Sequence, residues 1–154
     1  MLASGCEGSR PRMIGAMAPD FTVQDSDRTV SLHQLLGKPV VLSFWASWCP
    51  PCIQEMPSMV QLQNRMGTRV TVLAVSVDED EQAYHQFLQK YGVSLLTVRD
   101  PAQKSNTLYG TTGFPETFII DAKGRIRRKF VGPTDWTGKD VMNTLNDLLE
   151  NQNS

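Results

Sequence analysis

The chain has 154 residues, of which 40% are hydrophobic and 20% charged, and its formal net charge is -1. This length is enough for one domain with a core of its own, without disulfide staples. The balanced charge argues against a nucleic-acid partner, and no apolar run approaches the roughly 20 residues of a membrane-spanning helix. The 3 cysteines and 2 histidines fit neither a disulfide scaffold nor a zinc module.

Residues 1–16 contain much glycine, serine and arginine, and we expect a loose lead-in to a single domain at residues 17–154. Residues 2–6 (LASGC) resemble the end of a bacterial lipoprotein signal, in which small residues precede a cysteine that becomes lipidated. Two interpretations stay open: Cys6 carries a lipid anchor, or it is incidental.

Beyond the lead-in, strands alternate with helices. Residues 18–23 and 29–30 predict a hairpin, and Ser31 can cap a short helix that stops at Gly37. The later elements are a buried strand at 40–45, a helix at 53–66, a strand at 69–77, a helix at 79–91, a strand at 93–98, a short helix at 103–109, a hairpin of 117–121 with 125–131, and a helix from about 135. This order predicts a three-layer α/β sandwich with right-handed crossovers.

A basic run occupies the second strand of the last hairpin, at Arg125, Arg127, Arg128 and Lys129. Such a run usually forms a solvated face or protects the edge of a sheet, and we expect that role rather than a binding patch.

The candidate reactive residues are two cysteines that follow the strand at 40–45. Cys49 is followed by Pro50, Pro51 and Cys52, and prolines are tolerated in the first turn of a helix. Cys49 is therefore expected at a helix N-terminus, where the helix dipole favours the thiolate. Cys52 lies about one turn further on, close enough for a disulfide, which is the layout of a dithiol that exchanges electrons.

Two other interpretations of the pair are less well supported. A structural disulfide across so short a loop would restrict the unfolded chain little. A zinc site needs about four ligands, and Cys6, His33 and His85 share no ligand spacing with the pair.

The chain resembles thioredoxin-fold proteins, and in particular the TlpA/ResA/CcmG group of membrane-tethered thiol-disulfide oxidoreductases on the bacterial cell exterior. The resemblance covers about residues 18–150. It rests on APDF at 18–21, FWASWCPPC at 44–52, EMP at 55–57 and GTTGFPETFIID at 110–121. It implies a thioredoxin-like α/β/α sandwich with an N-terminal β-hairpin and, at residues 79–98, the helix-strand insert that separates this group from minimal thioredoxins.

The resemblance also implies roles for the site residues. Cys49 would attack a client disulfide and Cys52 would resolve the mixed disulfide, with no metal and no cofactor besides the Cys49–Cys52 disulfide. Substrate contacts would come from Trp48 and Pro50 beside the cysteines, and from Phe114 and Pro115 in the facing loop. In the family the bond before this proline is cis, and the backbone of the residue before it pairs with an extended peptide.

Glu55 lies three residues beyond Cys52 on the same face of the helix. In the group that the chain resembles, the matching acid tunes the cysteines. Minimal thioredoxins keep a buried acid on the strand before the motif, where this chain has Ser43. A carboxylate in an early helical turn is also favourable by itself, so a solvated role for Glu55 is the alternative.

The expected function is therefore reduction of protein disulfides at the cell exterior or periplasm by a monomer. By resemblance, the client is an apocytochrome c and the electrons come from a membrane thiol donor. A peroxiredoxin-like thiol peroxidase is one alternative, although Ala46 stands where those enzymes have Thr or Ser. A metal or haem chaperone and an oxidant are the others, and Pro51 before Cys52 resembles the reductants.

Overall fold

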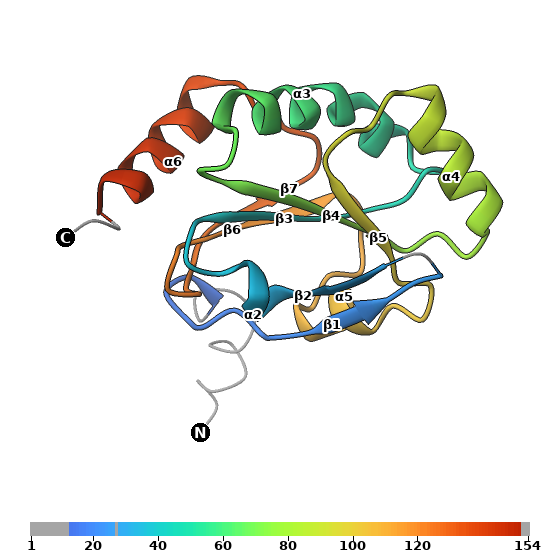
Figure 1. Ribbon diagram of the computed structural model, residues 1–154, viewed down its shortest axis with the longest axis horizontal. Coiled ribbons are helices and arrows are strands. Elements are labelled where there is room, and N and C mark those ends of the chain that lie inside the picture. The colour runs from blue at the N-terminus through green and yellow to red at the C-terminus, as the bar shows by residue number, and fades with distance from the viewer. Residues whose placement is uncertain (1–12, 27, 152–154) are drawn as a thin grey trace, which may run out of the picture.

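The computed structural model describes residues 13–26 and 28–151, which form a sheet covered on both faces (Figure 1). The sheet has 5 strands in the order β5-β4-β3-β6-β7. They are β3 (Val40–Trp45), β4 (Thr71–Ser76), β5 (Leu96–Arg99), β6 (Glu116–Ile120) and β7 (Ile126–Val131). β3, β4 and β5 run parallel, whereas β6 is antiparallel to β3 and β7 is antiparallel to β6.

Two layers enclose this sheet. One face is covered by α3 (Pro50–Met66), α4 (Glu81–Lys90) and α6 (Lys139–Asn151). The opposite face is covered by the hairpin of β1 (Thr22–Gln24) with β2 (Thr29–Ser31), by α2 (Leu32–Leu35) and by α5 (Lys104–Leu108). The thioredoxin-like α/β/α fold with an N-terminal hairpin is therefore confirmed, and α4 with β5 forms the expected helix-strand insert.

β3 is the centre of the molecule, and all 6 of its residues are buried. A strand that is covered on both faces is mostly apolar, which explains the run that precedes the cysteines, and its one polar residue, Ser43, is hydrogen-bonded to Thr117. Its side chains alternate between the two cores: Val41 and Trp45 face α3, whereas Phe44 faces the hairpin side.

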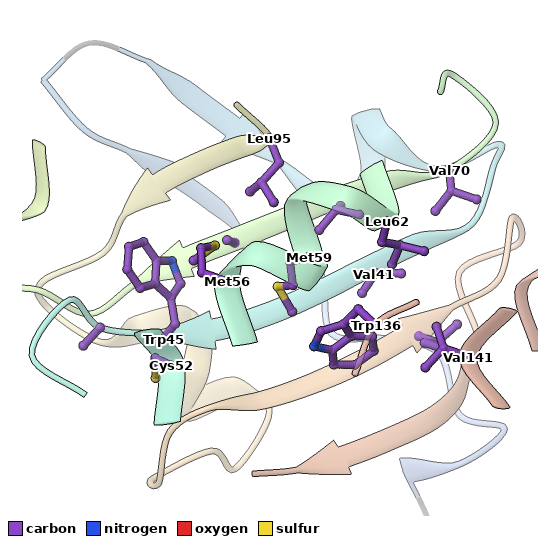
Figure 2. Close-up of a cluster of buried hydrophobic side chains, with 14 of the residues drawn as sticks. Val41, Trp45, Cys52, Met56, Met59, Leu62, Val70, Leu95, Trp136 and Val141 are labelled. Atoms are coloured by element: carbon purple, nitrogen blue, oxygen red, sulfur yellow. The ribbon is translucent and has the colours of Figure 1, made fainter. Parts of the chain in front are cut away.

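The core beneath α3 fixes that helix on the sheet (Figure 2). Met56, Met59 and Leu62 of α3 are at most 2% exposed and pack against Val41 and neighbouring strand residues. Because these contacts bury one whole face of α3, its N-terminal turn has a fixed position above the end of β3.

Aromatic rings fill the core on the other face. Phe44 lies 5.5 Å from Tyr109 and Tyr109 lies 5.1 Å from Phe118, measured between ring centroids. The Tyr109 hydroxyl donates a hydrogen bond of 2.7 Å to the carbonyl of Pro19. Burial is the main cause that raises the pKa of Tyr109 well above its ordinary value, so this hydroxyl stays protonated and ties α5 to the N-terminal segment.

Two helix starts differ from expectation. Ser31 precedes α2, but its hydroxyl bonds to Thr22, and Asp20 accepts the N–H of His33 instead. α6 begins at Lys139 rather than near 135, because Asp135 accepts the backbone N–H and the hydroxyl of Thr137 and forms a turn first.

The end of the expected lead-in is bonded to the domain. The N–H of Gly15 donates to the carbonyl of Ile126 at 2.7 Å, and the N–H of Ile126 donates to the carbonyl of Ala16 at 2.9 Å. Residues 13–16 therefore pack on the domain that we expected to begin at 17. Residues 1–12, and with them the question of Cys6, lie outside the described part of the chain.

The basic run at 125–129, most of which lies on β7, makes its contacts within the protein. Arg127 pairs with Asp121, Arg128 with Asp140, and Lys129 with Glu116. Arg125 donates to the carbonyl of Gly15 at 3.0 Å. These partners favour the structural role that we expected for the run.

Within residues 13–26 and 28–151, the structure contains no helix with the length and apolar character required to cross a lipid bilayer.

Replacing Leu62, which is fully buried under α3, with alanine should lower the free energy of unfolding by about 2–5 kcal/mol, because it removes buried methyl groups and leaves a cavity. Leu108→Ala is the control, since Leu108 is 55% exposed and its truncation should change stability by about 0.5 kcal/mol or less. Urea denaturation measures both. Equal effects would mean that α3 is not anchored as described.

Candidate active site

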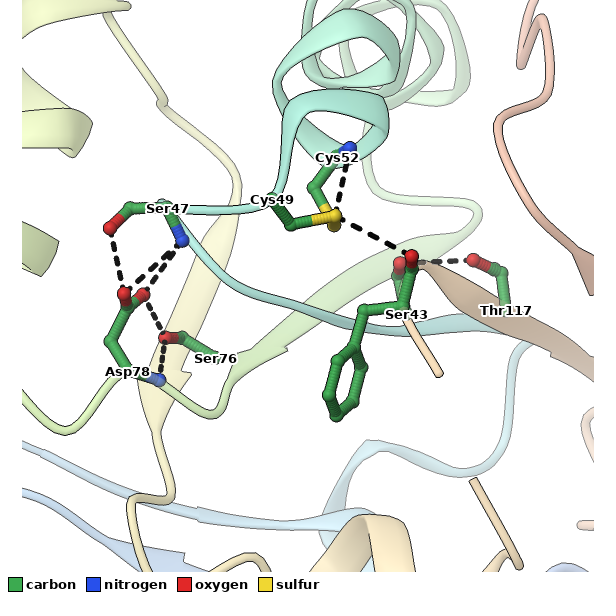
Figure 3. Close-up of a disulfide and its surroundings, with 8 residues drawn as sticks. Ser43, Ser47, Cys49, Cys52, Ser76, Asp78 and Thr117 are labelled. Carbon is green, nitrogen blue, oxygen red and sulfur yellow. Dashed lines mark hydrogen bonds between the residues drawn. A yellow bond between two sulfur atoms is a disulfide. The ribbon is translucent and has the colours of Figure 1, made fainter. Parts of the chain in front are cut away.

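Cys49 occupies the N-cap position of α3, and Pro50 begins the helix. Its Sγ accepts the backbone N–H of Cys52 at 3.3 Å, so a helix-terminal donor points at the sulfur as the sequence predicted (Figure 3). Cys49 and Cys52 form a disulfide, with their Cα atoms 5.3 Å apart. Cys49 is 4% exposed and Cys52 is 0% exposed, so Cys49 is the more accessible of the two.

The loop before β6 faces this disulfide. The Phe114–Pro115 peptide bond is cis, as the resemblance implied. The carbonyl oxygen of Phe114 lies 3.5 Å from Cys49 Sγ, and the N–H of Gly132 donates to the carbonyl of Pro115 at 3.0 Å. The Phe114 backbone is thus presented directly beside the outer sulfur.

An exposed aromatic side chain borders the same place. Trp48 is 64% exposed, and its ring meets the edge of Phe114 with centroids 6.2 Å apart. Pro50 is also exposed, whereas Pro115, the last residue of the loop before β6, is buried. The structure therefore brings all the residues expected to contact substrate to one end of the sheet, around Cys49.

Glu55 lies on the buried side of α3 and is 4% exposed. Its Oε1 accepts a hydrogen bond of 2.6 Å from Nε1 of Trp136. Burial raises the pKa of Glu55 to about 7, and the hydrogen bonds from Trp136 and from the backbone of Thr134 oppose part of that rise. The alternative of a solvated helix-turn carboxylate is therefore wrong, and both protonation states of Glu55 are populated at neutral pH.

Hydroxyl groups occupy the strands below the disulfide. Thr117 of β6 donates a hydrogen bond of 2.9 Å to Ser43 of β3, and each residue is 1% exposed (Figure 3). This is the strand position at which minimal thioredoxins carry an acid. A hydroxyl does not exchange a proton near neutral pH as a carboxyl with a raised pKa can.

Asp78 is a site residue that the sequence interpretation missed. It is 1% exposed, and its carboxylate accepts the backbone N–H of Ser47 at 3.0 Å and the Ser47 hydroxyl at 2.7 Å (Figure 3). The hydroxyl of Ser76 donates to the same carboxylate. Asp78 thus fixes the turn that leads from β3 into Cys49.

Acids occupy all of positions 78–81 before and at the start of α4, a pattern typical of a helix N-terminus, but Asp80 is the residue that caps α4, by accepting the N–H groups of Gln82 and Ala83. A signal for Asp78 was present, because it follows β4 closely and the carboxyl ends of neighbouring parallel strands meet at one edge of the sheet.

In the part of the chain that the structure describes, no three side chains of His, Cys, Asp or Glu lie close enough together to hold a metal ion.

Asp78→Ala should lower the free energy of unfolding by about 3 kcal/mol, because it leaves the buried hydroxyl of Ser76 and the part-buried donors of Ser47 without an acceptor. The matched control is Asp80→Ala, which removes an exposed helix cap and should cost about 1 kcal/mol. Chemical denaturation with the disulfide intact compares them. A cost for Asp78→Ala no larger than that of its control would contradict this role.

Glu55 should also make stability depend on pH. Its pKa is raised from 4.5 to about 7 in the folded state, so its contribution is fully present below pH 4.5 and is lost as pH rises through 7. Between pH 4.5 and 8, the free energy of unfolding of the wild type should fall by about 3 kcal/mol relative to Glu55→Gln. The measurement uses the oxidised protein, so that the thiols do not titrate. If the free energies of unfolding of the wild type and Glu55→Gln change with pH in parallel, burial does not raise the pKa of Glu55.

Comparison with known proteins agrees with this geometry. Residues 14–129 match the AhpC/TSA family. Thiol-disulfide oxidoreductase ResA from Bacillus thuringiensis (strain Al Hakam) is 36% identical over 121 residues, which are 77% of this chain and 70% of that protein.

Two solved structures share the fold. A protein from Chlorobium tepidum, described as a thiol:disulfide interchange protein of the DsbE type, has a TM-score of 0.82 and 31% identity, covering 88% of this chain and 97% of its own. A secreted disulfide oxidoreductase from Mycobacterium tuberculosis has a TM-score of 0.70 and 26% identity, covering 85% and 95%. With Cys49 and Cys52 paired at the start of α3, the chain belongs to the AhpC/TSA family and is a thiol-disulfide oxidoreductase of the ResA/DsbE type.

Proposed function

We propose that this oxidoreductase reduces disulfides in client proteins outside the cytoplasm, and that its client is an apocytochrome c whose two haem-binding cysteines must be in the thiol form. The observation that carries the proposal is the arrangement around Cys49. A helix-terminal N–H points at its sulfur, the Phe114 carbonyl lies 3.5 Å away, and the exposed Trp48 stands beside both.

The reaction begins from the reduced enzyme. The Cys49 thiolate attacks one sulfur of the client disulfide, which forms a mixed disulfide and releases the other client sulfur as a thiolate. Cys52 then loses its proton and attacks Cys49 Sγ, which releases the second client thiolate and forms the Cys49–Cys52 disulfide. Two electrons pass to the client, and no cofactor besides the cysteine pair takes part.

Two features of the site suit these two steps. The N–H of Cys52 at 3.3 Å and the dipole of α3 stabilise negative charge on Cys49. Cys52 is fully buried and must ionise without solvent, so it needs a nearby proton acceptor. Glu55, one turn further along α3 and with a pKa of about 7, accepts the Cys52 proton in this proposal.

The client contacts follow from the exposed groups. An extended peptide can pair with the backbone of Phe114 while its side chains contact Trp48 and Pro50. This mode reads the main chain of a polypeptide, so it suits an unfolded protein such as a cytochrome before haem attachment. A small disulfide has no extended main chain, so this backbone pairing would add little to its binding.

We place the enzyme at the cell exterior or periplasm. The secreted relative from Mycobacterium tuberculosis supports this placement. In this proposal the oxidised enzyme, acting as a monomer, receives electrons from a membrane thiol donor. A lipid on Cys6 would keep it near that donor.

The alternatives have less support. The disulfide joins Cys49 to Cys52, so both sulfurs belong to one redox pair instead of the single peroxidatic cysteine of a thiol peroxidase. Hydrogen peroxide consumption with a dithiol donor tests the peroxidase, and we expect little. Metal retained after purification and lost in Cys52→Ser would instead favour a chaperone.

Trp48→Ala should slow the reduction of an oxidised peptide containing Cys-x-x-Cys-His by about tenfold, and should change the reduction of a small aromatic disulfide by less than twofold. The expected loss corresponds to about 1.4 kcal/mol of client contact. Leu108→Ala removes a comparably exposed apolar side chain from α5 and serves as the control. Equal losses on both substrates would mean that Trp48 supports the cysteine and not the client.

A further inference from the structure

The two carboxyl oxygens of Glu55 have different surroundings. Oε1 receives the indole N–H of Trp136 at 2.6 Å. Oε2 is buried and has no hydrogen-bond partner of regular geometry among the residues that the structure describes, and the backbone of Thr134 is the other group that stabilises the charged carboxyl. A buried polar atom without a partner is uncommon, and at a reactive site it calls for an explanation.

Trp136 is itself held rigidly. It is 0% exposed, its ring meets the edge of Phe130 with centroids 5.0 Å apart, and Figure 2 shows it in the core beside α3. Its backbone N–H donates to the hydroxyl of Ser58 at 3.1 Å, and that hydroxyl also contacts the carbonyl of Glu55 at 3.0 Å. The loop between β7 and α6 is thereby fastened to α3 at the turn that carries Glu55.

We propose that Trp136 is a positioning residue for Glu55, whose indole N–H fixes Oε1 and so assigns the exchangeable proton to Oε2. An indole N–H can only donate a hydrogen bond. Oε1 must therefore be the acceptor in this bond, and a proton on the carboxyl is expected on Oε2 instead. This inference rests on the proposed role of Glu55 as the acceptor of the Cys52 proton. In that step the Cys52 S–H bond breaks and an Oε2–H bond forms, while the Trp136 bond to Oε1 is retained.

Glu55 also borders a cavity on this side of α3. A cavity of about 320 Å³ is lined by Gln54, Glu55, Ser58, Pro133, Thr134 and Asp135. Neither Trp48 nor Phe114 lines it.

Other titratable and charged groups lie around this site. Asp135 lines the cavity and interacts with Arg65 of α3. From β7, Arg128 lies over the Phe130 ring and pairs with Asp140 of α6. In the reduced enzyme the two thiols of α3 also titrate, so the decisive measurement uses the oxidised form.

The test replaces Trp136 with phenylalanine, which keeps a ring in the core and removes the N–H. Trp45→Phe is the matched control, because Trp45 is 1% exposed and its Nε1 has no hydrogen-bond partner within the described chain. The protonated carboxyl of Glu55 is followed by its infrared C=O band as pH is raised, with the band assigned by its absence in Glu55→Gln.

We expect a wild-type midpoint near pH 7, a midpoint higher by about one unit in Trp136→Phe, and no change in Trp45→Phe. The shift is upward because the lost donor had stabilised the charged form. Client reduction at pH 7 should fall several-fold in Trp136→Phe, with its pH profile displaced to higher pH. A midpoint that is unchanged or lower in Trp136→Phe would overturn the proposal.

A second measurement needs no substitution that could disturb folding. In the oxidised wild type, the indole ¹⁵N–¹H resonance of Trp136 should shift with the same midpoint as the infrared band, whereas that of Trp45 should not. A Trp136 resonance that does not titrate would overturn the assignment. If Glu55→Gln instead reduces clients at the wild-type rate, the catalytic role of Glu55 fails, while both spectroscopic results still decide the Trp136 contact.

Discussion

The structure depends on one junction, where β3 ends and α3 begins. β3 is covered on both faces and its neighbours β4 and β6 pair along its length, so its end point is fixed. Cys49 is the N-cap at that point, and the prolines that follow fit the first turn, where backbone N–H groups have no helical partner. A reactive sulfur is thus held at the positive end of a helix by packing that lies far from it.

Three segments distant in sequence converge on this junction, and each makes a different contribution. Asp78 at the end of β4 fixes the turn before Cys49. The loop before β6 brings the Phe114 carbonyl to the outer sulfur. The loop after β7 brings Trp136 to Glu55 on the inner side of α3. In the proposed reaction, the client contacts the Phe114 side of the cysteine pair and Glu55 accepts the proton of Cys52.

The sequence predicted the features that are local. The run at 40–45, the two cysteines and the hairpin of β6 with β7 each carry a short-range signal, and the structure confirms them. The residue pattern also indicated α4 and β5, but the family resemblance was needed to identify them as an insert and to predict the cis bond at Pro115.

Contacts between distant segments could not be read in this way. Trp136 is an isolated aromatic residue in sequence, and its bond to Glu55 spans 81 positions. Ser31 has the residue type of a helix cap, yet the hairpin places Thr22 within reach of its hydroxyl, and that tertiary contact prevails. Predictions that depended on neighbours in sequence were confirmed. The predicted Ser31 cap was wrong because the fold brings a different hydrogen-bond partner to its hydroxyl.

The central claim is that the Cys49–Cys52 pair donates electrons to client disulfides. The most direct test is a redox titration of the purified protein against a glutathione or dithiothreitol couple at pH 7, followed by alkylation of the thiols. The account predicts a potential near that of thioredoxin, about -270 mV. A value near -120 mV, as in a strong oxidant, would reverse the direction of electron flow and contradict it.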